Sequence, residues 1–131
     1  QAVPKLTFPG GMLTGCSAGF LNVPKIKGSH TAMKTGMLAG AAAAEAVLAG
    51  SATGQEVKKY EADVRSSWVW DELMRVRNFK PAWHAGMWPG LSYGGMTLMV
   101  SRGKEPWTFR WSKKDSDYTK PAVDCQKIEY P

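Results

Sequence analysis

The sequence predicts an α+β fold that begins with a strand, a glycine-rich turn and a long helix. The apolar run at residues 12–14 is typical of a short buried strand, and the small residues 15–19 predict a tight turn. Residues 30–49 predict a helix that follows Gly28 and Ser29. A strand and a small-residue turn that end at a helix N-terminus let backbone N–H groups approach an anion. This stretch therefore predicts a site for a phosphorylated or redox cofactor.

The ends and the faces of the long helix carry further signals. Ser29 is a favourable N-cap residue, Thr31 adds a hydroxyl one turn later, and Gly50 occupies the C′ position. Gly36 and Gly40 each cost about 1 kcal/mol of helix stability relative to alanine. Close approach of a neighbouring element would offset that cost. The small residues therefore predict tight packing of this helix against a sheet.

Residues 55–78 predict a second, amphipathic helix. Apolar side chains recur at helical spacing, and the charged side chains lie mostly off that stripe. The stripe consists of Val57, Tyr60, Val64, Trp68, Val69, Leu73 and Val76. We expect this helix to cover the core.

The segment 81–100 contains no lysine, arginine, aspartate or glutamate, yet Pro89 and its glycines preclude one straight helix. Its aromatic residues are of the kind found at the headgroup boundary of membranes, and Arg102 and Lys104 follow where anionic lipid would lie. Two interpretations stay open. The segment inserts into one leaflet of a membrane, or it is an internal apolar segment that lines the core or covers an apolar ligand.

The tail is polar and interrupted by proline, with a candidate short strand at 107–111 in which Trp107, Phe109 and Trp111 alternate. The chain thus divides into residues 1–54, 55–104 and 105–131. Because it starts at Gln1 and stops in an extended segment, we expect it to be a piece of a longer protein.

Charge and composition exclude several function classes. The 131 residues include 17 basic and 11 acidic side chains, but the basic residues are dispersed and no nucleic-acid-binding motif is present, so no nucleic-acid partner is predicted. Cys16 and Cys125 are the only cysteines, without metal-ligand spacing, so no metal site is expected within the chain. His30 and His84 lack a nucleophile or carboxylate partner in the pattern. Hydrolysis is therefore disfavoured, and no catalytic residue is assigned.

Several motifs together carry a family resemblance. The stretch GGMLTGCSAGFLNVPKIKGSHTAMKTGMLAGAAAAEA, followed by YEADVRSSWVWDELMRVRN, SYGGM, RGKEPWTFRW and KPAVDCQKIEYP, resembles the electron-transfer flavoprotein–ubiquinone oxidoreductase family. The resemblance covers nearly the whole chain. It implies the C-terminal part of an α/β FAD-binding fold, a region for ubiquinone and the membrane, and a connector toward an iron–sulfur domain. The family's GxGxxG motif and its 4Fe-4S cysteines are not in these residues.

The resemblance also implies site residues. FAD-binding residues are Gly15, Cys16, Ser17, Gly19, Asn22, Gly28, Ser29 and Thr31. In related flavoproteins this turn reads GDAAG, and its acidic residue contacts the ribityl chain of the flavin. Cys16 stands at that position here, so the resemblance implies that backbone groups of the turn make the ribityl contact instead. Residues expected near the quinone or the membrane are Phe20, Trp83, His84, Met87, Trp88, Leu91, Tyr93, Met96 and Met99.

The resemblance implies part of an enzyme that passes electrons from reduced electron-transfer flavoprotein through FAD and a 4Fe-4S cluster to ubiquinone. The implied partners are electron-transfer flavoprotein, ubiquinone, membrane lipid and another chain or segment with the absent motifs. The implied location is the matrix side of the mitochondrial inner membrane, or the cytoplasmic face of a bacterial inner membrane. The 131 residues alone are expected to be inactive. A different class stays open, namely a non-catalytic structural or interaction subunit of a respiratory membrane assembly.

Overall fold

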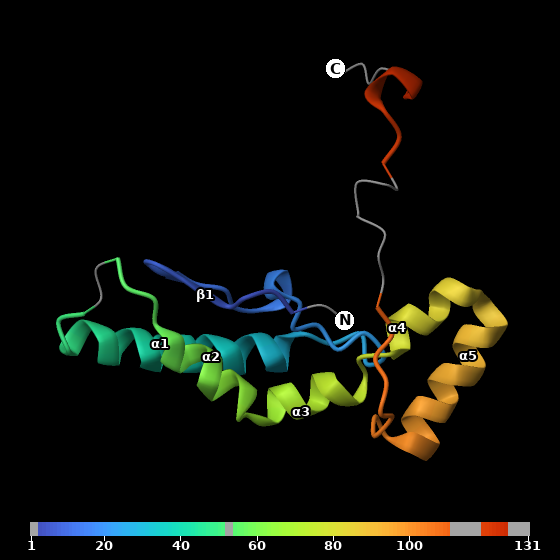
Figure 1. Ribbon diagram of the computed structural model, residues 1–131, viewed down its shortest axis with the longest axis horizontal. Coiled ribbons are helices and arrows are strands. Elements are labelled where there is room, and N and C mark those ends of the chain that lie inside the picture. Colours follow the sequence, from blue (N-terminus) through green and yellow to red (C-terminus); the bar gives the residue numbers. More distant parts are fainter. Residues whose placement is uncertain (1–2, 52–53, 111–118, 126–131) are drawn as a thin grey trace.

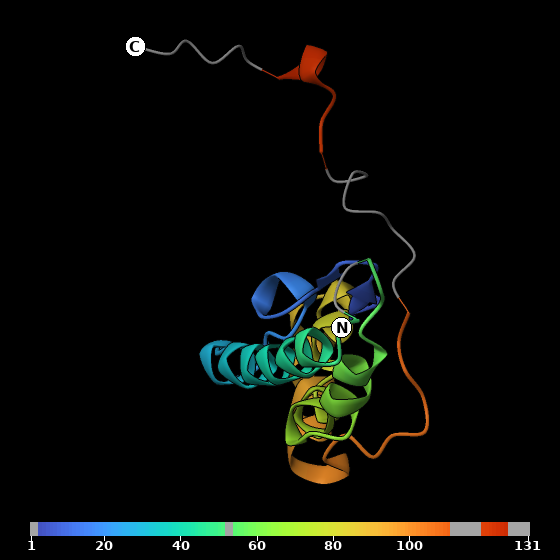
Figure 2. The same cartoon turned by 90° about the vertical axis from the view of Figure 1, so that its left-hand side faces the viewer.

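The computed structural model describes residues 3–51, 54–110 and 119–125, and combines helices with a small sheet as the α+β class predicts (Figure 1). The elements are β1 (Thr7–Phe8), β2 (Gly11–Met12), η1 (Cys16–Ala18), α1 (Ser29–Leu48), α2 (Lys58–Arg65), α3 (Trp68–Arg75), α4 (Phe79–Ala82), η2 (Trp83–Ala85), α5 (Met87–Met96), η3 (Thr97–Ser101) and η5 (Ala122–Asp124). The helices α2 and α3 run back along α1, with the hairpin on another side of α1 (Figures 1 and 2). The last two helices before the tail, α4 and α5, form a separate lobe with η2 and η3.

The strand prediction was wrong in position. Gly11–Met12 pairs antiparallel with Thr7–Phe8, so the structure has a hairpin, and residues 13 and 14 lie beyond the strand. The turn between the strands contains Pro9 and Gly10, and Gly10 has φ +79°, the conformation that a type II turn requires. The position of the strand is therefore set by its pairing with the preceding segment and not by the apolar pattern of residues 12–14.

Both ends of α1 can be compared with the prediction. The N-cap is Gly28, without a side-chain cap, and Ser29 is already helical, so the N-cap assignment to Ser29 was wrong. The C-terminal prediction is confirmed. Gly50 has φ +66°, its N–H donates to Val47 O at 3.0 Å, and the N–H of Ser51 donates to Ala46 O at 3.0 Å. These two bonds form a Schellman motif.

The predicted helix at 55–78 is interrupted and gives two helices. Ser67 is extended, with φ −89° and ψ 159°, and separates α2 from α3. The hydroxyl of Ser66 donates to Asp63 O at 3.1 Å, and that of Ser67 donates to Val64 O at 2.7 Å. Such local hydrogen bonds compete with a continuous helix, which explains the break.

The core lies between α1, α2, α3 and the N-terminal segment. It includes Phe20, Tyr60, Val64 and Val69, all fully buried. Tyr60 reaches across the core, where its hydroxyl donates to Leu13 O at 2.8 Å. Burial raises the pKa of Tyr60 to about 12. The apolar spacing of residues 57–73 therefore identified Tyr60, Val64, Val69 and Leu73 as core positions although the helix is broken, whereas Trp68 of the same stripe is 45% exposed.

The face of α1 with Gly36 and Gly40 is exposed, contrary to the expected tight packing. A Cβ at either glycine would meet nothing within 4 Å among the described residues. Instead α1 buries the opposite positions, Thr31, Thr35, Ala39 and Ala42. Residues 3–51, 54–110 and 119–125 therefore contain no sheet or other element packed against Gly36 and Gly40.

The lobe beyond α3 is compact because two glycines allow close packing. A Cβ at Gly90 would lie 2.9 Å from Trp83 Cα, and one at Gly94 would lie 2.8 Å from Cε2 of Phe79. The predicted break in residues 81–100 is confirmed by the change of direction between η2 and α5. In the described part of the chain no helix combines the length and the apolar character needed to cross a bilayer.

The returning segment, which includes residues 105–110, follows the lobe and passes the C-terminal end of α3. Asn78, which is buried, donates from Nδ2 to Trp107 O at 3.0 Å, and its Oδ1 accepts the N–H of Phe109 at 2.9 Å. No strand forms over the described residues 107–110, because these backbone groups bond to a side chain rather than to another strand. Trp111, the last residue of the predicted strand, lies outside the described residues.

Candidate functional site

The small-residue turn lies against the start of α1. A 3-10 helix, Cys16–Ala18, is flanked by Gly15 with φ +70° and Gly19 with φ +86°, conformations that glycine adopts without strain. A Cβ at Gly28 would collide with Sγ of Cys16, and one at Gly15 would lie 3.6 Å from Cβ of Ala32. Glycine at these positions therefore brings the turn directly onto the first turn of α1.

Backbone donors are available at this junction. The first intrahelical hydrogen bond runs from the N–H of Ala32 to Gly28 O at 2.8 Å, so the N–H groups of Ser29, His30 and Thr31 precede the helical pattern. These groups lie at the positive end of the dipole of a 20-residue helix. Ser17 and Ser29 are exposed beside them. The arrangement is chemically suited to an anionic group.

Some predicted cofactor residues are buried and bonded within the chain. The hydroxyl of Thr31 donates to Phe20 O at 2.5 Å and to Gly28 O at 2.8 Å, so it shapes the turn from inside. The N–H of Gly15 donates to Oγ1 of Thr35 at 3.2 Å. Phe20, which was expected near the quinone, is fully buried and belongs to the core, and its place near a quinone stays a prediction. The side chains of Cys16, Ser17 and Ser29 are the exposed members of the predicted set, with Gly15 and Gly19 partly exposed.

A network that the sequence did not reveal supports the same junction. Glu72 Oε1 accepts hydrogen bonds from Nδ2 of Asn22 at 2.6 Å, Nζ of Lys25 at 3.1 Å and Nε2 of His30 at 3.0 Å. The His30 ring also stacks on Trp68, with centroids 5.7 Å apart. Burial raises the pKa of Glu72, but the hydrogen bonds from His30, Asn22 and Lys25 outweigh it and lower that pKa to about 2. The partners lie 42 to 50 residues apart in sequence, so no local motif indicates them.

We expect Glu72→Gln to lower the free energy of unfolding and to make that free energy depend less on pH in the acidic range. The loss at neutral pH is about 1–3 kcal/mol, because the buried Asn22 amide loses its charged acceptor. Since the folded pKa lies below the unfolded value of 4.5, the Glu72 contribution is present above pH 4.5 and disappears as pH falls toward about 2. Urea unfolding across this range measures the effect.

The control for that prediction is Glu45→Gln, because the Glu45 carboxylate is largely exposed. This variant should retain the wild-type acid dependence, whereas Glu72→Gln should show a shallower loss of stability. Equal acid dependence of Glu72→Gln and the wild type would contradict the assignment.

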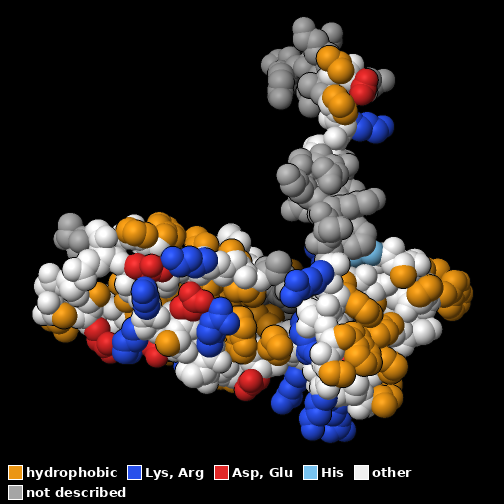
Figure 3. All heavy atoms as spheres, in the orientation of Figure 1, with side chains coloured by type: hydrophobic (Ala, Val, Ile, Leu, Met, Phe, Trp, Pro, Cys, Tyr) orange, Lys and Arg blue, Asp and Glu red, His pale blue; other side chains and the backbone are white. Residues whose placement is uncertain are grey.

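Apart from Phe20, the residues predicted near quinone or membrane gather on the lobe, where Figure 3 shows apolar side chains on the exposed face. Trp88 is 72% exposed and Met99 is 81% exposed. The others with exposed side chains are Trp83, His84, Met87, Leu91 and Met96. Within the described part of the chain these side chains do not belong to the core, and both interpretations of segment 81–100 stay predictions.

Tyr93 differs from the other predicted lobe residues because it is partly buried by the returning segment. Its hydroxyl accepts a hydrogen bond from Nε1 of Trp107 at 2.7 Å, and its ring packs on Phe109 with centroids 5.0 Å apart. The alternate spacing of Trp107 and Phe109 thus places both against one tyrosine. Tyr93 holds the returning segment on the lobe.

The described residues contain no group of three His, Cys, Asp or Glu side chains that could hold a metal ion. Cys16 and Cys125 are both free thiols with exposed side chains. The thiol of Cys16 lies within the turn, while Cys125 directly follows η5 near the end of the described chain.

Comparison with known proteins gives a consistent result. No protein-family model matches the chain. The chain is 50% identical over 137 residues to the mitochondrial electron transfer flavoprotein-ubiquinone oxidoreductase of Mus musculus, a match that covers all of this chain and 22% of that protein. The proteins of the same name from Dictyostelium discoideum and Arabidopsis thaliana are 46% and 47% identical, over 99% and 100% of this chain and 23% and 20% of theirs. The chain therefore spans about a fifth of the length of these relatives.

Proposed function

Because the chain belongs to the family of electron transfer flavoprotein-ubiquinone oxidoreductases, we propose that it forms part of a flavoenzyme that passes electrons from reduced electron-transfer flavoprotein to ubiquinone. The observation that carries the proposal is about 50% identity over the whole chain with relatives that all bear this name. In the proposal the 4Fe-4S cluster and the dinucleotide-binding GxGxxG motif come from outside these 131 residues.

In this proposal FAD lies at the junction of η1 and α1. Gly15, Cys16, Ser17 and Ser29 are the residues that would hold it, and their combination of exposed side chains, positive φ and free helix N–H groups fits an anionic cofactor. FAD supplies the redox chemistry when bound. The chain provides backbone donors and the positive end of the α1 dipole, which favour negative charge at this position. Thr31, Asn22 and Gly28 keep the junction in shape.

The lobe is the proposed contact with membrane and ubiquinone. Its exposed tryptophans and methionines offer apolar surface and interfacial aromatic rings, which suit insertion into one leaflet. The relatives are named mitochondrial, so we place the protein in mitochondria. Within that compartment we propose the matrix side of the inner membrane, where ubiquinone is dissolved in the bilayer.

The visible absorbance spectrum of the protein, purified together with any bound chain, tests the flavin proposal. Flavin bands are expected in the wild type. We expect Ser17→Glu to weaken flavin binding about tenfold, because the new carboxylate competes for the donors at the start of α1 and tenfold corresponds to 1.4 kcal/mol. Ser66→Glu, on the connection between α2 and α3, introduces the same charge away from η1 and should leave the spectrum unchanged.

Absence of flavin from the purified assembly would overturn this part of the proposal and favour the non-catalytic structural subunit. Flavin bound equally by wild type and Ser17→Glu would retain a flavoprotein but reject the assigned residues.

A further inference from the structure

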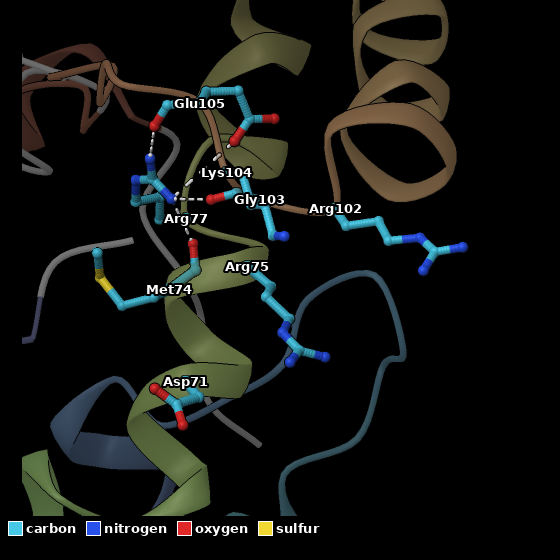
Figure 4. A pocket seen from close by; sticks show the side chains of 8 residues that line it. All are labelled: Asp71, Met74, Arg75, Arg77, Arg102, Gly103, Lys104 and Glu105. Carbon is cyan, nitrogen blue, oxygen red and sulfur yellow. Dashed lines mark hydrogen bonds and ion pairs between the residues drawn. The ribbon is translucent and has the colours of Figure 1, made fainter.

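A cationic cavity of about 500 Å³ lies between α3 and the turn that follows η3 (Figure 4). Four basic side chains line it, namely Arg75, Arg77, Arg102 and Lys104. Two acidic side chains, Asp71 and Glu105, line it as well, so the cavity carries net positive charge. Neither the flavin site nor the core uses it.

The backbone fixes this cluster in place. Arg102 directly follows η3 with φ +50°, and Gly103 comes next with φ +77°. A Cβ at Gly103 would lie 2.6 Å from Arg75 O, so the turn lies directly on the end of α3. This close contact holds Arg102 and Lys104 next to Arg75.

The charges within the cavity are not equally available. Arg77 is bonded to backbone carbonyls, and its Nη1 lies 4.0 Å from Oε2 of the buried Glu105. Arg75, Arg102 and Lys104 take part in no ion pair among the described residues. In Figure 4 all three side chains lie on one side of Arg77, with Lys104 nearest to it and Arg102 extending outward. Three cationic groups are therefore free to meet an anion.

The position of the cavity indicates which anion it meets. Leu98, Met99 and Val100 immediately precede the turn and are exposed, so an apolar surface borders the basic side chains. Figure 3 shows Lys and Arg side chains at the lower edge of the apolar lobe. Basic residues beside exposed apolar ones match a bilayer surface, where phosphate groups border the acyl chains. An acidic protein segment is the competing occupant, and the vesicle and peptide comparison below distinguishes the two.

We propose that Arg75, Arg102 and Lys104 bind the headgroup phosphate of an anionic phospholipid while the neighbouring apolar residues enter the leaflet. This inference rests on the membrane contact in the proposed function and adds a lipid class to it. The phosphate oxygens accept charge-assisted hydrogen bonds from the guanidinium and ammonium groups. The site orients the lobe, because it fixes which edge of the apolar surface faces anionic headgroups.

Vesicle flotation of the full chain tests the proposal, with phosphatidylcholine vesicles compared with vesicles that also contain phosphatidylglycerol. We expect the wild type to bind the anionic vesicles at least about tenfold more tightly. The combined variant Arg75→Gln, Arg102→Asn and Lys104→Gln should bind both vesicles equally. Asparagine replaces Arg102 because it tolerates positive φ. A second variant carries only Arg102→Asn and Lys104→Gln and keeps Arg75. It should lose most of the preference for anionic vesicles, and it replaces the first variant in the test if that one does not fold.

The matched control is Lys27→Gln, Lys34→Gln and Lys58→Gln, which removes the same charge from residues outside the lobe. It should retain the preference, and an equal loss would overturn the cavity as the site. A polyglutamate peptide that binds the wild type more tightly than anionic vesicles do would overturn the lipid in favour of an acidic protein partner.

A third variant separates this inference from the proposed membrane contact. We expect Trp88→Glu to weaken binding to both vesicles, because it places a charge on the exposed apolar surface. If Trp88→Glu has that effect while the wild type shows no anionic preference, the membrane contact holds and the phosphate site is rejected. If the wild type binds neither vesicle, both are rejected.

Discussion

Replacement of Arg77 by methionine is expected to lower the free energy of unfolding by about 3–5 kcal/mol. The guanidinium is largely buried and joins the end of α3 to the returning segment. Its partners are the carbonyl oxygens of Met74 at 2.7 Å, Gly103 at 2.7 Å, Glu105 and Trp107 at 3.1 Å, and the hydroxyl of Thr108 at 2.9 Å. Methionine fills similar space but donates nothing, so these carbonyls and the Glu105 carboxylate lose a charged partner. Urea unfolding measures the change.

Arg65→Met is the matched control for Arg77→Met. Arg65 pairs with Glu61 at 2.7 Å and lies over the Trp70 ring at 4.5 Å, but its side chain is about half exposed. Its loss should cost about 1 kcal/mol or less, because exposed pairs contribute little. A cost for Arg77→Met no larger than that for Arg65→Met would refute the central role of Arg77.

The sequence predicts those parts of the fold that depend on local backbone preference. Gly50 identifies the end of α1, and the Gly15–Gly19 turn is confirmed, because positive φ at glycine is a local property. The apolar stripe finds Tyr60 and Val64 in the core. The break at Ser67 escapes prediction, because apolar spacing continues through it while side-chain to backbone bonds interrupt the helix.

The candidate site is predicted less completely, because side-chain chemistry alone does not reveal burial. Asn22 and Thr31 have polar groups suited to a cofactor, but both are buried and bonded to the chain itself. Glu72 and Arg75 appear in the sequence as ordinary charges on a polar helix face. Only the folded chain places Glu72 beside His30 and Arg75 beside Lys104. Contacts across more than 20 residues leave no periodic signal in one sequence.

Gly103→Ala should destabilise the protein by about 2–4 kcal/mol. The new Cβ would lie 2.6 Å from O and 2.8 Å from C of Arg75, and it would collide with Arg75 Cα. These atoms are backbone, so they cannot rotate away as a side-chain end does. The φ of +77° adds strain for alanine. Thermal and urea unfolding both report the loss.

Gly36→Ala is the control and should have the opposite sign. It lies in the exposed middle of α1, where an added Cβ would meet nothing within 4 Å among the described residues, so alanine should stabilise the helix by about 0.5–1 kcal/mol. Gly103→Ala and Arg77→Met should also be non-additive in the double variant, because Gly103 O is a partner of Arg77. Additive losses would show that the two residues act on separate contacts. If the double variant loses less free energy of unfolding than the sum of the two single losses, one junction holds the lobe, the returning segment and the basic cavity together.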